Sequence, residues 1–327
     1  MAKTSAPWEQ WDHKYARLDD TMKLHYVEVG PRDGIPVVLV HGWPDLWFAW
    51  RHQMGPLSKK YRVIAPDLRG FGRSGKPLDP AQYGSKVITN DLARLLDVLE
   101  IPRAVFIGHD WGGAIVWRMC LYHPSRVLAV CGVCTPYFPP SQTYVDLDTL
   151  VAHVPQFKYQ QFLAEGDAAA KVLDQATRRF FTLMFRRFHE LDHDVEMVDH
   201  MRNAATSDHP AFTQASDMLT DAERDYYVRE YTQSGFRASL NWYTTRALDF
   251  QTEKDLPAVI PHKALYIGAA KDRVLKPELA AHMPKLMPQL EMKTIEKAGH
   301  WILSEQREQV TNTLLTWLDK VDKLAQP

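Results

Sequence analysis

Cysteine, net charge and long hydrophobic runs are all scarce in this sequence. Three cysteines in 327 residues are too few, and odd in number, for a disulfide framework, so we expect a reducing, cytoplasmic setting. The net charge of −1 gives no reason to expect nucleic acid or an anionic membrane as a partner. No run of about 18 apolar residues is present, so we expect no membrane span. The first residues lack a basic and an apolar region, so we expect no signal peptide.

The residues that are present predict an α/β protein with one large core and a smaller appendage. At 45% apolar, the chain can bury a core of that size. Continuous apolar runs at 36–40, 127–133 and 264–268 are typical of buried parallel strands. Residues 22–29 alternate in the manner of an edge strand, and 277–286 and 311–321 have helical spacing.

The character of the chain changes between 138 and 256. Pro136, Pro139 and Pro140 mark the start of this segment, after which strand and helix cease to alternate. Helix-like stretches follow at 159–165, 167–186, 221–231 and 237–248. An insert after such a strand lies over the carboxyl edge of the sheet, where ligands bind. We therefore expect a core formed by residues 1–137 and 257–327 and a helical cap formed by residues 138–256.

One stretch, 103–122, indicates the chemistry. A short apolar run is followed by Gly108, His109, Asp110, Trp111 and Gly112, and then by a helix-like run. Such a turn between a strand and a helix is a nucleophile elbow, which lifts one side chain clear of the sheet. Glycines allow the strained backbone and the close approach of the helix to its strand. The lifted side chain is an aspartate.

An aspartate at this place favours attack on a saturated carbon. The unpaired N–H groups at the start of the helix favour the carboxylate form of Asp110. Attack of a carboxylate on an epoxide carbon or an alkyl halide gives an ester, which water can cleave to regenerate the enzyme. A serine would form an ether and would be inactivated. The sequence thus predicts a two-step covalent mechanism.

The sequence resembles the α/β-hydrolase superfamily and, within it, the soluble epoxide hydrolases of the fungal type. The resemblance covers essentially the whole chain and rests on the motifs HGWP (41–44), WRHQ (50–53), DLRGFGRS (67–74), GHDWGG (108–113), NWY (241–243) and GHW (299–301). It implies the α/β-hydrolase fold, with a mostly parallel central sheet flanked by helices and an inserted helical cap. It also implies conversion of epoxides to vicinal diols without a cofactor.

The resemblance assigns roles to further residues. It implies that the backbone N–H groups of Trp43 and Trp111 form an oxyanion hole, which hydrolysis of an ester at Asp110 requires. Ring opening leaves an alkoxide that needs a proton or hydrogen bond, and the family uses two cap tyrosines for this. Tyr243 matches one of them through the NWY motif, and Tyr159 matches the other by its context.

The order of residues along the chain predicts which two side chains drive hydrolysis of the ester. Asp272 and His300 come after Asp110 in the order nucleophile, acid, histidine that is typical of this fold. We expect His300 to activate water and Asp272 to orient the imidazole. His41 is interpreted as a structural histidine that holds its loop.

Three motifs are interpreted as coincidental. The glycines of 70–75 match a dinucleotide fingerprint, but a proline follows at once and no helix opens there. Cys131 and Cys134 lie in an apolar strand and are expected in the core. His189 and His193 fit a zinc-protease motif without a third ligand, so we expect no metal.

Two other functions stay open. A haloalkane or haloacetate dehalogenase would use the same triad, with an indole N–H such as that of Trp111 holding the halide. A non-catalytic receptor for a small ligand could use the same scaffold. We expect a small apolar or aromatic epoxide as substrate, because aromatic residues are available for a pocket formed by Trp43, Trp111, Trp242 and Trp301.

Overall fold

A twisted eight-stranded sheet forms the centre of the protein in the computed structural model, which describes residues 7–190 and 197–325. The strand order is β1-β2-β4-β3-β5-β6-β7-β8, with β2 antiparallel to both neighbours and all other pairs parallel. The strands are β1 (His13–Arg17), β2 (Lys23–Val29), β3 (Pro36–Val40), β4 (Arg62–Pro66), β5 (Ala104–His109), β6 (Val127–Val133), β7 (Lys263–Ala269) and β8 (Leu290–Ile295). The predicted fold class is therefore confirmed.

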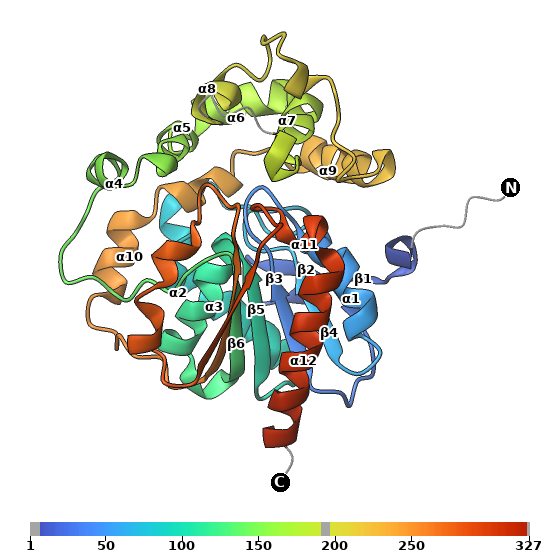
Figure 1. Ribbon diagram of the computed structural model, residues 1–327, viewed down its shortest axis with the longest axis vertical. Helices are drawn as coiled ribbons and strands as arrows, with labels where there is room; N and C mark the ends of the chain where they lie inside the picture. The colour runs from blue at the N-terminus through green and yellow to red at the C-terminus, as the bar shows by residue number, and fades with distance from the viewer. Residues whose placement is uncertain (1–6, 191–196, 326–327) are drawn as a thin grey trace, which may run out of the picture.

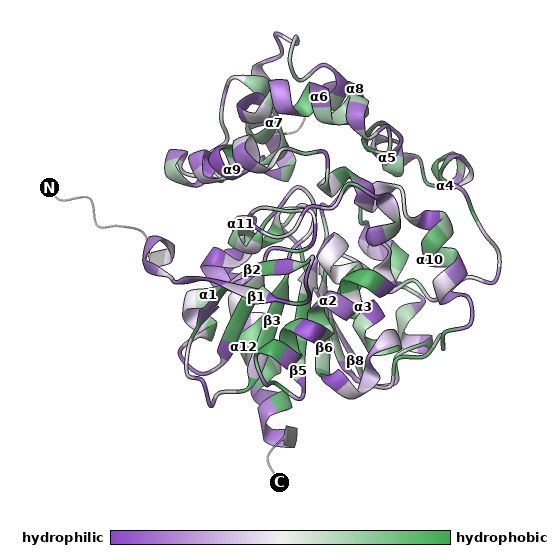
Figure 2. Cartoon of the chain, turned by 180° about the vertical axis from the view of Figure 1, so that it is seen from behind, coloured by the Kyte–Doolittle hydropathy of each residue, from purple (hydrophilic) through white to green (hydrophobic). Residues whose placement is uncertain are grey.

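Helices cover both faces of this sheet (Figure 1). Helices α1 and α12 pack together on one face, and α2 and α3 pack together on the other. The bounds are α1 (Arg51–Leu57), α2 (Ser85–Val98), α3 (Trp111–Tyr122), α11 (Ile302–Glu305) and α12 (Arg307–Ala325). The central strands are hydrophobic along their length, as strands buried on both faces must be (Figure 2).

The chain reverses its direction of travel across the sheet at β3, and this positions the functional site. From β3 the chain passes to β4 on one side and then crosses to β5 on the other, so that β3 pairs with both. In open α/β sheets, a crevice forms outside the carboxyl ends of the strands at such a point. The loops after β3 and β5 carry Trp43 and Asp110.

The segment between β6 and β7 supplies the remaining helices. They are α4 (Leu147–His153), α5 (Tyr159–Leu163), α6 (Asp167–Gln175), α7 (Thr177–Met184), α8 (Met197–Arg202), α9 (Asp221–Ser234) and α10 (Arg246–Glu253). Helices α4 to α9 lie above the sheet, whereas α10 packs against α2 beside the core (Figure 1). The exact division into a core and a cap at 138 and 256 stays a prediction.

Several predicted elements need correction. Residues 22–29 were predicted to form an edge strand. They form a strand, β2, but β1 pairs with its outer side and is itself the edge strand. The helix predicted over 167–186 is interrupted at Ala176, and the one over 237–248 is a 3-10 turn (Ser239–Tyr243) followed by α10. Residues 277–286 form two short 3-10 turns, because Pro284 has no N–H to continue a helix.

Candidate active site

The turn between β5 and α3 has the geometry of a nucleophile elbow. Asp110 has a φ of +52°, a left-handed conformation that is rare for residues other than glycine. A Cβ on Gly108 would lie 2.1 Å from the carbonyl oxygen of Gly112, and a Cβ on Gly112 would lie 2.1 Å from that of Val40. Both glycines are therefore required for α3 to start this close to the sheet. Strain of this kind is typical of functional sites.

Two backbone N–H groups face the Asp110 carboxylate. The N–H of Trp43 donates to Oδ1 over 2.8 Å, and the N–H of Trp111 also hydrogen-bonds the carboxylate. A Cβ on Gly42 would lie only 2.3 Å from Oδ1, so glycine is needed beside the carboxylate. Burial raises the pKa of Asp110, whereas His300 and these two N–H groups lower it. The two N–H groups predicted to form an oxyanion hole thus both contact the carboxylate, and their catalytic role stays a prediction.

His41 holds the loop that carries Trp43. Its Nδ1 donates to the carbonyl oxygen of Gly42 over 2.8 Å, and its Nε2 accepts the N–H of Leu68 over 3.0 Å. Burial lowers the pKa of His41 to about 4, so the ring is neutral. These contacts agree with the structural interpretation of His41.

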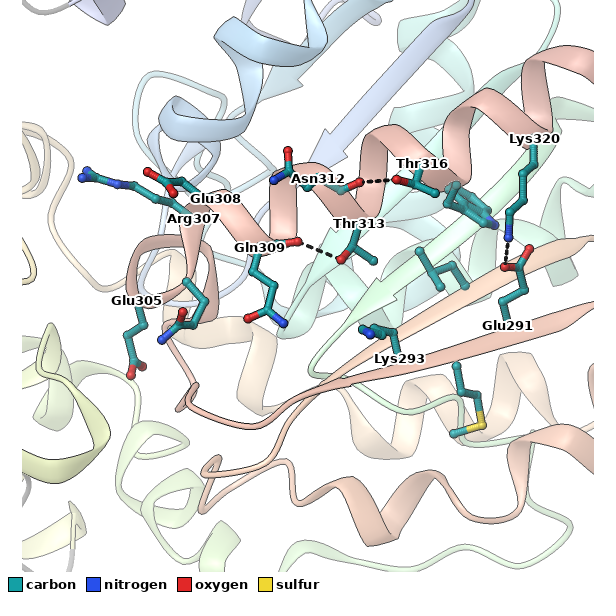
Figure 3. A pocket seen from close by; sticks show the side chains of 14 residues that line it. Glu291, Lys293, Glu305, Arg307, Glu308, Gln309, Asn312, Thr313, Thr316 and Lys320 are labelled. Carbon is teal, nitrogen blue, oxygen red and sulfur yellow. Dashed lines mark hydrogen bonds and ion pairs between the residues drawn. The ribbon is translucent and has the colours of Figure 1, made fainter.

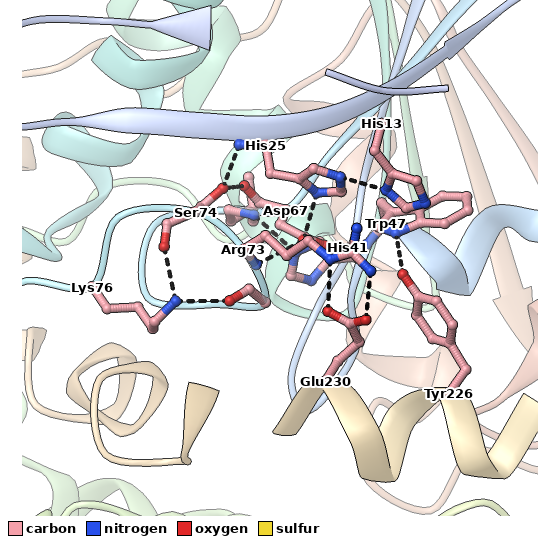
Figure 4. A network of polar contacts seen from close by, with 12 residues as sticks. His13, His25, His41, Trp47, Asp67, Arg73, Ser74, Lys76, Tyr226 and Glu230 are labelled. Atoms are coloured by element: carbon pink, nitrogen blue, oxygen red, sulfur yellow. Dashed lines mark hydrogen bonds and ion pairs between the residues drawn. The ribbon is translucent and has the colours of Figure 1, made fainter. Parts of the chain in front are cut away.

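A buried network around Asp67 stiffens the same loop (Figure 4). Asp67 accepts the backbone N–H of Trp47 over 2.9 Å and the Nδ1–H of His25 over 2.7 Å. Burial would raise the pKa of Asp67, but His25, His41 and the Trp47 N–H hold it at about 2. Beside this network, Arg73 forms an ion pair with Glu230 of α9 over 2.8 Å, which connects the loop to the overlying helices.

The structure brings His300 between two carboxylates. Its Nδ1 donates to Oδ2 of Asp272 over 2.8 Å, and its Nε2 lies 3.7 Å from Oδ2 of Asp110. Burial alone would lower the pKa of His300, but Asp272 and Asp110 raise it to about 9. Asp272 itself is buried and accepts the backbone N–H groups of Val274 and Leu275. Burial would raise the pKa of Asp272, but His300 and those N–H groups lower it.

The two predicted tyrosines lie close to each other and within the influence of the Asp110 charge. Tyr159 begins α5 and Tyr243 ends the 3-10 turn Ser239–Tyr243, and their ring centres are 6.3 Å apart. Burial raises the pKa of both hydroxyls, and the Asp110 charge raises them further. Both hydroxyls therefore keep their protons at neutral pH. A hydrogen bond from the Trp111 side chain acts in the opposite direction on Tyr243.

These groups share one cavity of about 440 Å³, within the range typical of small-ligand sites. Trp43 and Trp301 line it as predicted. Trp242 does not: its indole N–H donates to the carbonyl oxygen of Arg69 over 3.1 Å, and its ring packs on Phe71. The Trp111 ring contacts Trp242 and Tyr243 without joining the lining.

Sequence reasoning missed the apolar wall opposite the carboxylate. This wall comes from α7 and α8 and the turn between them, and consists of Met184, Phe188, Met197, Val198 and Met201. The four-residue spacing of Met197 and Met201 was the one available signal, since it places both on one face of a helix. Glu305, from the end of α11, also borders the cavity and was not predicted.

The motifs interpreted as coincidental carry no metal site in the described residues. His189 lies in a 3-10 turn (Phe188–Glu190), whereas His193 falls outside the described residues. Among the described residues, no group of three His, Cys, Asp or Glu could hold a metal ion. Cys131 and Cys134 are free thiols in the core, as predicted. None of the described helices is long and apolar enough to cross a membrane.

An aspartate elbow, a histidine–aspartate pair after the last strands and this sheet order define an α/β hydrolase. Residues 35–306 match the family described as alpha/beta hydrolase fold, so the chain belongs to that family. Within the family, it groups with the epoxide hydrolases.

The relatives include proteins from animals, bacteria, a fungus and a plant. Bifunctional epoxide hydrolase 2 of Rattus norvegicus is 34% identical over 94% of this chain, and the chain spans only 55% of that relative's length. Epoxide hydrolase A of Mycobacterium tuberculosis is 33% identical over 92% of this chain and 96% of its own. The crystal structure of epoxide hydrolase A from Mycobacterium thermoresistibile superposes with a TM-score of 0.84, at 31% identity, covering 95% of this chain and 98% of that one.

Proposed function

We propose that this protein is an epoxide hydrolase, which converts an epoxide and water to a vicinal diol without a cofactor. One observation carries the proposal. Asp110 shares one cavity with two tyrosines and with a histidine–aspartate pair, and the histidine Nε2 lies 3.7 Å from the Asp110 carboxylate. The relatives named epoxide hydrolase support it.

In the first step, an Asp110 oxygen attacks a ring carbon and the carbon–oxygen bond of the epoxide breaks. The electron pair goes to the former ring oxygen, which Tyr159 and Tyr243 stabilise by donating hydrogen bonds and a proton. The product is an ester of Asp110 that carries a β-hydroxyl group. The raised pKa of both tyrosines supports this role, because the hydroxyls keep their protons until the alkoxide forms.

In the second step, His300 takes a proton from water, which attacks the ester carbonyl carbon. The N–H groups of Trp43 and Trp111 stabilise the resulting oxyanion. Cleavage of the acyl carbon–oxygen bond then releases the diol, and the proton held by His300 neutralises the departing oxygen. Asp272 orients the ring and stabilises the imidazolium.

The charge on His300 has to change between these steps. In the free protein, His300 is an imidazolium because Asp272 and Asp110 both raise its pKa. An ester at Asp110 removes one of these negative charges, so the pKa of His300 falls. The ring then gives up its extra proton, which replaces the one that a tyrosine gave to the alkoxide, and becomes a base. Formation of the ester thus prepares its own hydrolysis.

The contacts of the indoles disfavour a dehalogenase. A halide site needs an N–H that points into the cavity, but the indole of Trp43 donates to Ser239 Oγ and that of Trp301 donates to the carbonyl oxygen of Met184. The Trp111 indole bonds the Tyr243 side chain. A pure receptor, in turn, has no use for a histidine held between two carboxylates.

The methionine, valine and aromatic side chains in the lining of the cavity favour an apolar or aromatic epoxide. The free cysteines favour a reducing, cytoplasmic location.

A panel of alkyl and aryl epoxides tests the function. We expect diol formation with at least one of them, a transient mass increase on Asp110 equal to the epoxide mass, and loss of both in Asp110→Ala. Halide release from matched haloalkanes without diol formation would favour the dehalogenase. Tight binding of the same compounds without turnover would favour a receptor.

A further inference from the structure

Glu305 is a buried carboxylate in contact with the His300 loop, and the mechanism above gives it no task. It is the last residue of α11 and is 9% exposed. It borders the catalytic cavity and also a second, polar groove between β8 and α12. Figure 3 shows Glu305 at one end of this groove, with Glu291 and Lys320 at the other.

One oxygen of Glu305 connects the histidine loop to the cap. Oε2 accepts the N–H of Gly299, next to His300, over 3.1 Å and the N–H of Phe188, in the cap wall of the cavity, over 3.5 Å. A Cβ on Gly299 would lie 2.7 Å from that of Phe188 and 2.8 Å from Oε1 of Glu305. Only glycine allows the three segments to approach this closely.

The cap peptide at Phe188 is also held from its other side. Its carbonyl oxygen accepts a hydrogen bond from Arg273 over 3.4 Å, and Arg273 follows Asp272 directly in the chain. Glu305 and Arg273 thus fasten one residue of the cap to the two loops that carry His300 and Asp272. The position of the cap and the position of the catalytic pair are mechanically coupled there.

The other oxygen of Glu305 is an unused acceptor. Oε1 is buried and has no hydrogen-bond partner among the described residues. A buried charged acceptor normally has a partner. An unpaired oxygen on a residue that lines both the polar groove and the catalytic cavity indicates that this carboxylate has a role at the site.

We propose that Glu305 is a positioning residue for ester hydrolysis, which fixes His300 against the cap. This inference rests on the proposed function. Glu305 acts through His300 and does not touch the epoxide carbon. It therefore governs the second step and leaves the first step unchanged.

The pH profile of ester hydrolysis distinguishes an electrostatic role of Glu305 from a purely structural one, because only the loss of its charge would shift that profile. Glu305 raises the pKa of His300, as do Asp272 and Asp110. Two neutral groups contact the carbonyl oxygen of His300: the ring of His109, through its Nε2–H, and the thiol of Cys134. The neutral phenols of Tyr159 and Tyr243 and the cations Lys271 and Arg273 line the same cavity. Removing the charge of Glu305 should lower the pKa of His300 and move the pH profile of hydrolysis to lower pH.

The test compares Glu305→Gln, Glu305→Asp and Glu308→Gln in the full chain, using an epoxide that the wild type converts. Glu308 is the matched control, because it lines the same groove but is exposed and does not border the cavity. Rapid quenching and mass spectrometry measure formation and decay of the Asp110 ester separately, at a series of pH values. Wild-type ester formation in each sample also reports that the site is folded.

We expect Glu305→Gln to form the ester at the wild-type rate, to hydrolyse it about tenfold more slowly or worse, and to shift the hydrolysis profile to lower pH. Glu305→Asp should hydrolyse slowly with an unshifted profile, because it keeps the charge but cannot reach both N–H groups. Glu308→Gln should match the wild type.

If Glu305→Gln hydrolyses the ester at the wild-type rate and with the wild-type pH profile, the proposal is wrong. If Glu305→Gln does not fold, wild-type decay in Glu305→Asp would overturn it. Absence of any ester in the wild type would instead refute the proposed function.

Discussion

The pKa of His300 should fall when Asp110 is esterified, and the size of the fall can be worked out from the structure. His300 Nε2 and Asp110 Oδ2 are 3.7 Å apart, and both side chains are largely buried. At that distance, Coulomb attraction is worth roughly 1 kcal/mol in water and about 4 kcal/mol at an effective dielectric constant of 20. Since 1.36 kcal/mol corresponds to one pH unit, the pKa should fall by about one to three pH units. Starting from about 9, His300 becomes a competent base near neutral pH.

The direction in which each rate changes with pH follows from the chemistry of that step. Hydrolysis requires neutral His300, so its rate should rise with pH through the pKa of the ester form and then level off. Formation of the ester requires ionised Asp110, whose pKa is raised by burial, so this step should slow as the pH falls through that raised value. The tyrosines impose no limit at high pH, because their pKa values are raised.

The assay is a single turnover with protein in excess, quenched at intervals, in which mass spectrometry follows the Asp110 ester. In parallel, NMR of the imidazole gives the pKa of His300 in the free protein. We expect a free-protein value near 9 and a hydrolysis midpoint at least about one pH unit lower. Equal values for the free protein and the ester would refute the reasoning, as would hydrolysis that speeds up as the pH falls.

Three further changes test individual contacts. Replacing Tyr159 and Tyr243 together by Phe should reduce ester formation by a factor of about 100 or more, measured by single-turnover trapping, and an unchanged rate would exclude both as donors. Gly42→Ala should abolish ester formation and lower the melting temperature, because the new Cβ would lie 2.3 Å from the Asp110 carboxylate; wild-type activity would contradict this. Asp272→Asn should let the ester form and accumulate, with hydrolysis slowed by up to about 10⁴, and ester decay at the wild-type rate would show that Asp272 does not act through His300.

The sequence is sufficient to predict the elbow and the triad because local motifs and parallel strands determine them. Glycines at 108 and 112 indicate the strained turn by themselves, and the structure shows the close contacts that demand them. The carboxyl ends of parallel strands meet at one edge, so loops after different strands necessarily converge there. Asp272 and His300 therefore meet Asp110 although they lie far from it in the sequence.

Other features depend on contacts that no local pattern encodes. Strand β1 buries only Ala16 of its five residues, so it carries no hydrophobic run, and its pairing with β2 defines it. Trp242 was predicted in the pocket as one of several available aromatic residues, but its indole N–H instead donates to the carbonyl oxygen of Arg69. Glu305 appears in the sequence as an ordinary helix-end acid. Only the approach of Phe188 and Gly299 shows that it is buried at the site.

The central claim is that the Asp110 carboxylate forms a covalent ester whose acyl bond is then cleaved by water. One turnover in ¹⁸O-labelled water, with protein in excess over epoxide, tests this most directly. The account predicts that one heavy oxygen enters the peptide containing Asp110 and that the diol carries none, because its new oxygen comes from the aspartate. A labelled diol with an unlabelled Asp110 would show that water attacks the epoxide directly, and would contradict the account.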